Sequence, residues 1–76
     1  MNNLRRKQIE KLNEQLHDIQ SSLEETKDDE QRYFDFIPEN LQESERYVSS
    51  GEAIDDLDNA INSIEDSITN LETILQ

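Results

Sequence analysis

The residue types that carry enzymatic chemistry are scarce in this chain. Its single histidine, His17, stands beside Asp18, and there is no cysteine. No serine and acidic residue are spaced to complete a catalytic triad with His17, and no H-E-x-x-H zinc motif occurs. The lack of cysteine also excludes disulfide frameworks and thiolate metal sites. We therefore predict that the protein is not an enzyme, that His17 is an exposed helical residue, and that no metal or cofactor is needed.

Acidic residues dominate the charge, with 19 Asp and Glu against 7 Lys and Arg and a net charge of −12. The densest stretch ends at Asp58 without the glycine that an EF-hand loop requires, so no calcium site is predicted. The candidate acidic surface consists of Glu52, Asp55, Asp56, Asp58, Glu65 and Asp66. It could imitate the phosphates of DNA, or it could be an ordinary solvated helix face. Direct binding to nucleic acid is disfavoured, because proteins that bind the phosphate backbone are basic.

All four aromatic residues lie in a short central part of the chain, and two of them follow an arginine. The candidate binding residues are Arg32, Tyr33, Phe34, Phe36, Arg46 and Tyr47. Tyrosine and arginine are the residue types that dominate binding hot spots in protein interfaces. Together they can also hold and stack an anionic nucleotide. The alternative is structural: a small aromatic plug that closes one end of the fold.

Two apolar series with alternating steps of three and four must position these side chains. The first is Ile9, Leu12, Leu16, Ile19 and Leu23, and the second is Ile54, Leu57, Ile61, Ile64, Ile68, Leu71 and Leu75. Such heptads predict two amphipathic helices and argue against disorder, despite the high charge.

The only proline, Pro38, separates the two series. A proline restricts the residue before it and suits the first position of a helix. We therefore expect a single domain, 1–76, with one helix over about 3–34, a turn over 35–38 and a second helix over about 38–75. Gly51 is the weak point of the second helix, which we expect to be continuous or kinked there. The alternative is a helix broken into about 38–48 and 50–75, because Ser49, Ser50, Gly51 and Glu52 resemble a capping box.

The predicted fold is all-α, an antiparallel coiled-coil-like helical hairpin. Charge supports this orientation, because folding back brings the basic residues near the N-terminus alongside Glu65, Asp66 and Glu72; these basic residues are Arg5, Arg6, Lys7 and Lys11. One hairpin cannot bury both stripes fully, so we expect a homodimeric four-helix bundle or a larger helical assembly. A monomer that folds on its target is the competing possibility. No apolar run is long enough to span a membrane, and no signal peptide is recognised.

A resemblance to known proteins rests on the stretch from Ile37 to Tyr47, which contains a PE-x-LQ-x-SER core, and on the acidic heptads after it. This pattern resembles a group of short acidic proteins of phages and prophages of Gram-positive bacteria that have no assigned activity. The resemblance implies a mobile-element setting and a location in the cytoplasm of an infected or lysogenic host.

In that setting we expect a non-enzymatic protein that binds and inhibits or modulates a host protein, such as an anti-phage defence protein. Two other functions stay open: an oligomeric sponge that sequesters an anionic nucleotide immune signal in Arg/Tyr pockets, and an acidic DNA-mimic inhibitor. A coiled-coil spacer is a further possibility. The sequence leaves open the target, the oligomer order and the presence of a small ligand.

Overall fold

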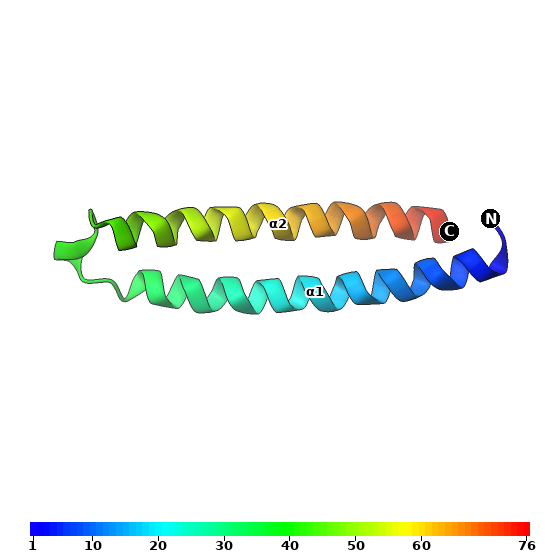
Figure 1. Cartoon of the computed structure of the whole chain (residues 1–76), viewed down its shortest axis with the longest axis horizontal. Helices are drawn as coiled ribbons and strands as arrows, with labels where there is room; N and C mark the ends of the chain where they lie inside the picture. Colours follow the sequence, from blue (N-terminus) through cyan, green and yellow to red (C-terminus); the bar gives the residue numbers. More distant parts are fainter.

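The first helix begins where the Asn2 side chain accepts a hydrogen bond from the Arg5 amide at 2.8 Å. In the computed structural model, which describes residues 1–76, helix α1 spans Asn3–Asp35, a short 3-10 helix η1 spans Glu39–Leu41, and helix α2 spans Glu45–Leu75. The two long helices lie side by side and antiparallel, with both chain ends at the end opposite the turn (Figure 1). The result is a rod of 60 × 15 × 14 Å. The predicted all-α hairpin is confirmed.

The turn departs from the prediction that the second helix begins at Pro38. Pro38 has an extended backbone, with ψ of 146°, so it does not start an α-helix. The chain instead forms η1, in which the Leu41 amide donates to the Pro38 carbonyl at 2.8 Å. Helix α2 begins only at Glu45, because the Ser44 side chain accepts a hydrogen bond from the Tyr47 amide at 3.3 Å and thereby caps the helix.

Gly51 lies within α2, and the helix passes through it without a break. Its φ is not positive, so the backbone needs no special glycine conformation there. The alternative of a helix broken into about 38–48 and 50–75 is therefore wrong. The serine that caps the helix is Ser44, five residues before Ser49.

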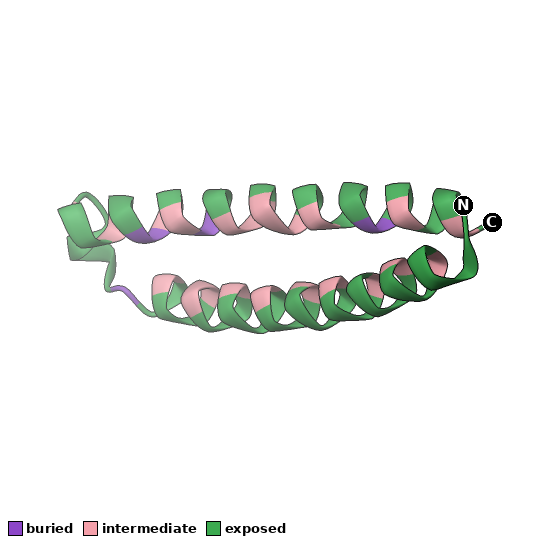
Figure 2. Cartoon of the chain, turned by 45° about the vertical axis from the view of Figure 1, so that its right-hand side comes forward, coloured by how far each residue is buried: buried purple, intermediate pink, exposed green.

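The seam, meaning the face of each helix that is turned toward the other, is made on α2 by the apolar heptads. Ile54 and Ile68 are buried, and Ile68 is only 2% exposed. The other members are half-buried: Leu57, Ile61, Ile64, Leu71 and Leu75. Figure 2 shows the buried and half-buried residues of both helices on their facing sides, with the exposed residues outside.

The seam of α1 differs from the expected apolar series. Leu12 and Ile19 are 53% and 48% exposed, so in the single hairpin these two members of the apolar series lie outside the seam between the helices. Apart from Gln31, the half-buried positions of α1 follow a series rotated by one residue: Arg6, Ile9, Asn13, Leu16, Gln20, Leu23, Lys27, Glu30 and Phe34. The centre of the apolar stripe of α1 therefore points to one side of α2 rather than directly at it.

The polar side chains in this seam form hydrogen bonds or ion pairs, with one exception. Ser50 of α2, 3% exposed, donates from Oγ to Oε1 of Glu30 at 2.7 Å. Asn13 is the exception, because its Oδ1 is buried and accepts no hydrogen bond. A buried polar atom without a partner lowers stability, so Asn13 is a weak point of the seam.

Candidate interaction site at the turn

The end of the rod that carries the turn is anchored by Ile37, the one buried residue between the two long helices. The chain around it is tied by backbone hydrogen bonds, in which the Ile37 amide donates to the Phe34 carbonyl at 3.2 Å and the Ser44 amide to the Leu41 carbonyl at 3.0 Å. These contacts fix the path of the turn. The side chains on it are therefore held on an ordered backbone.

The aromatic cluster is divided between two faces of this end. Phe34 and Tyr47 stack on one another, with ring centroids 4.4 Å apart and planes inclined by 23°. They join α1 to α2 and line a hollow on one side together with Gly51 and Ile54. For these two aromatics the structural alternative, an aromatic plug that closes the hairpin, describes their position well.

The other predicted residues of the cluster line a second hollow of about 440 Å³, which we call the turn-end hollow. Its lining residues are Arg32, Tyr33, Phe36, Ile37, Pro38, Leu41, Ser44 and Arg46. Phe36 is 83% exposed, the most exposed large apolar side chain of the chain. The structure thus brings together four of the six predicted binding residues and separates Phe34 and Tyr47 from them.

Two guanidinium groups with different surroundings border the turn-end hollow. Arg32 forms an ion pair with Asp29, one turn earlier on α1, and both side chains are largely exposed. Arg46 has no ion-pair partner within the chain, so its charge is available to a ligand or a partner. Both line the hollow together with Tyr33, which gives the hollow cationic and aromatic groups.

Leu41 and Ser44 also line the hollow, and sequence reasoning missed them. The sequence predicts Leu41 within a second helix that starts at Pro38, whereas it ends η1 and is 48% exposed. The sequence signal that places Leu41 before α2 is Ser44 followed by Glu45, a capping serine with an acidic residue in the first turn of the helix.

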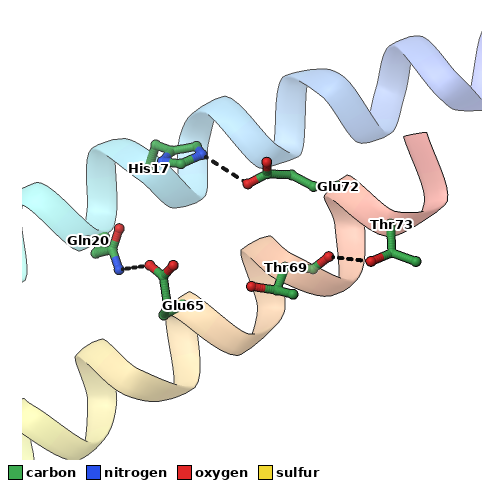
Figure 3. Close-up of polar contacts among 6 residues, drawn as sticks. All are labelled: His17, Gln20, Glu65, Thr69, Glu72 and Thr73. Atoms are coloured by element: carbon green, nitrogen blue, oxygen red, sulfur yellow. Dashed lines mark hydrogen bonds and ion pairs between the residues drawn. The ribbon is translucent and has the colours of Figure 1, made fainter. Parts of the chain in front are cut away.

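The side of the hairpin where Lys27, Gln20 and His17 meet α2, which we call the polar side, contains the contacts between acidic and polar residues. Gln20 Nε2 donates to Glu65 at 2.5 Å, and His17 Nε2 lies 3.7 Å from Glu72 (Figure 3). Lys27 Nζ lies 2.5 Å from Asp58 Oδ1. The hydrogen bond to Asp58 raises the pKa of Lys27.

These contacts divide the candidate acidic surface. Asp58 and Glu65 are engaged with residues of α1, whereas the remaining four members are exposed and form no ion pair within the chain: Glu52, Asp55, Asp56 and Asp66. The six carboxylates therefore do not act as one set. Asp58 and Glu65 help to hold the hairpin, and the other four face solvent.

The basic residues near the N-terminus make a different contact from the expected one. None of them forms an ion pair with Glu65, Asp66 or Glu72. Arg6 instead donates to the carbonyls of Ile74 and Leu75, at 3.5 and 2.5 Å. These carbonyls lack partners within α2, and a cation there also complements the helix dipole. The expected pairing with carboxylates is wrong, and Arg6 caps the end of α2.

His17 is exposed, and its only contact with an acidic group is with Glu72. Glu14 precedes it by three residues, a spacing used by metal ligands in helical bundles. No group of three or more His, Asp or Glu side chains is arranged to hold a metal ion. Neither long helix contains an apolar stretch of the length needed to cross a membrane.

Comparison of this chain with models of known protein families, with curated proteins and with solved structures found no match.

Proposed function

We propose that this protein is a non-enzymatic interaction protein that self-associates and binds another protein with its turn end. The observation that carries the proposal is the exposure of Phe36 beside a hollow lined by Arg32, Tyr33 and Arg46. Following the resemblance to short phage proteins, the partner is a host protein that is inhibited or modulated, such as a defence protein. Self-association completes a helical bundle around the incompletely buried hairpin.

Three properties of the turn end support a protein partner. Aromatic residues and arginine are enriched in protein interfaces, and a fully covered aromatic ring anchors many of them. An aromatic ring that is 83% exposed gains most from such a cover. The Phe34–Tyr47 stack and the buried Ile37 hold the turn in place before binding, which lowers the entropy lost on association.

A photo-reactive amino acid placed at Phe36 tests this proposal in lysate of a Gram-positive bacterium. We expect one host protein to be crosslinked, and we expect crosslinking to fall when Arg46 is also replaced by alanine. The matched control carries the photo-reactive group at Asn62, an exposed residue of α2 away from the turn. Capture of the same proteins from both positions, or of none from position 36, refutes the proposal.

A second candidate function is favoured by the same hollow. Arg32, Arg46 and Tyr33 line it together, and two guanidiniums beside a phenol ring suit the phosphates and base of an anionic nucleotide. In this reading the protein is an oligomeric sponge for a nucleotide signal. Isothermal titration with cyclic dinucleotides and ADP-ribose derivatives would give saturable heat that Arg46→Ala abolishes. Flat traces with the native chain exclude this function.

A further inference from the structure

The hairpin has a second lengthwise side, opposite the polar side, and its residues are neither paired nor covered. We call it the apolar side and define it by the exposed or half-buried residues that flank the seam there: Leu12, Ile19, Ala53, Ala60, Ser67 and Ile74. The α1 members are seven residues apart, as are successive α2 members, so each set forms one line along its helix. A groove of about 490 Å³ joins the two lines, because Leu12, Ile19 and Ser67 lie in its lining with Leu16 and Leu71 of the seam.

This side owes its exposure to the rotation of α1 described above. The apolar stripe of α1 is centred between α2 and the apolar side, so half of it faces solvent. On α2, the flanking residues Ala53, Ala60 and Ser67 are small, and another helix could pack closely against them. The α1 residues are large and the α2 residues mostly small, which allows two such surfaces to interdigitate.

Charge distinguishes the apolar side from the rest of the molecule. The two lines, extended by heptad steps along both helices, contain the guanidiniums Arg5 and Arg46 and no carboxylate. The next line outward on each helix, through Gln15 and Asn70 of the groove lining, adds the carboxylates Asp29 and Asp56. Positive and negative charges are thus equal in number there, whereas the chain as a whole carries −12. By contrast, the outer face of α2 carries Glu52, Asp55 and Asp66 and no basic residue, so two copies meeting there would repel one another. A copy of this chain meets less repulsion on the apolar side than on that face.

The dimensions are also sufficient. A lengthwise side of a rod of 60 × 15 × 14 Å offers about 900 Å², close to the roughly 800 Å² that each partner buries in a standard interface. Only three apolar residues, Ile37, Ile54 and Ile68, are buried in the isolated hairpin. A second layer of helices would add the core that the hairpin lacks.

We infer that the apolar side is the surface on which a second copy of this chain docks, giving a two-fold four-helix bundle with the polar sides outermost. This inference rests on the self-association in the proposed function and names the surface that carries it. Its interface is isologous, so both copies use the same surface, and residues near the two-fold axis lie close to their own counterparts.

Crosslinking through single introduced cysteines tests the inference, because the native chain has none. Ala60→Cys lies on the apolar side midway along α2, and Asn62→Cys, two residues away, is exposed on the opposite side. Both substitutions are small and leave the seam intact. With a short bismaleimide we expect a strong dimer band from Ala60→Cys and little from Asn62→Cys. Equal bands, or a stronger one from Asn62→Cys, overturn the inference.

The mass in solution separates this inference from the proposed self-association. Analytical ultracentrifugation of the native chain should give twice the 8.9 kDa of one chain. Leu12→Gln with Ile19→Gln should lower it to 8.9 kDa at the same concentration, with helical circular dichroism retained. The matched control is Val48→Gln, which alters an exposed apolar residue in the hollow lined by Phe34 and Tyr47 and should keep the dimer.

A doubly substituted chain that remains dimeric shows that self-association uses another surface, which refutes the inference and leaves the proposed self-association standing. A native chain of 8.9 kDa at every concentration refutes both. Binding at the turn end is measured separately, by the photo-crosslinking at Phe36.

Discussion

Replacing Gly51 by alanine tests how α2 passes through its only glycine. Glycine in a helix interior costs about 0.8–1.0 kcal/mol relative to alanine. The Gly51 backbone is helical with no positive φ, so alanine fits it without strain. The new Cβ would lie 3.4 Å from Cε2 and 4.0 Å from Cζ of Phe34, which is ordinary van der Waals contact. We therefore expect Gly51→Ala to raise the free energy of unfolding by about 1 kcal/mol.

Thermal unfolding followed by circular dichroism measures this change. For a domain of this size, about 1 kcal/mol corresponds to a rise in Tm of roughly 4–8 °C. Variants must be compared at one protein concentration, because self-association makes Tm depend on concentration. Asn62→Ala is the control, since it alters an exposed helical residue and changes propensity alone by a few tenths of a kcal/mol.

Gly51→Pro provides the opposite test. In a continuous helix, proline removes a hydrogen bond and clashes with the preceding turn, at a cost of about 3 kcal/mol or more. A helix that restarted near Ser49 would accept proline in its first turn. Loss of stability in Gly51→Ala, or native stability in Gly51→Pro, would refute the reasoning that α2 is continuous and that position 51 has room for a methyl group.

Three further predictions concern single contacts. Ser44→Ala should lower the free energy of unfolding in urea by about 1 kcal/mol by removing the cap of α2, and Ser44→Asp should restore it. Asn13→Leu should raise that free energy by about 1–3 kcal/mol by removing an unpaired buried amide oxygen; a decrease would show that the amide has a partner in the assembly. The third concerns alkaline pH. The hydrogen bond to Asp58 raises the pKa of Lys27 in the folded state. The contact therefore stabilises the fold fully below pH 10.5, the ordinary lysine pKa, and this stabilisation is lost as pH rises through the higher pKa of the folded state. Melting curves above pH 10.5 should therefore show a larger loss of Tm for the native chain than for Lys27→Met, and parallel losses would contradict this pairing.

The hairpin itself could be predicted because its main signals are local. The steps of three and four from Ile54 to Leu75 define one face of a helix without reference to anything else in the chain. Pro38 marks the region of the turn for an equally local reason, the restricted backbone around a proline. Within that region, α2 could start after Pro38 or after Ser44. Which start is used depends on where the backbone amides find hydrogen-bond acceptors, and only the folded turn determines this.

The rotation of α1 could not be predicted from spacing. Ile9, Leu16 and Leu23 belong to two overlapping series, one that continues through Leu12 and Ile19 and one that continues through Asn13 and Gln20. Apolarity favours the first series. The structure adopts the second, in which Gln20 meets Glu65 and Lys27 meets Asp58, and these partners are known only once the two helices lie together.

For the candidate site, too, the local part of the prediction is correct and the part that depends on helix packing is not. Proximity in sequence to the turn correctly placed all six Arg, Tyr and Phe residues at one end of the rod. Neighbours such as Tyr33 and Phe34, or Arg46 and Tyr47, point to different sides of a helix, and the rotation of α1 decided which side each one reached. The sequence therefore grouped residues that the fold separates into an internal stack and an open hollow.

The placement of the two chain ends has a practical consequence. Both emerge at the end of the rod opposite the turn, in a molecule 60 Å long (Figure 1). If a fluorescent protein or a surface anchor were fused to either chain end, the turn would lie at the far end of the rod, away from the fused partner. The same geometry makes the hairpin a compact scaffold on which other short loops could be displayed in place of residues 36–44.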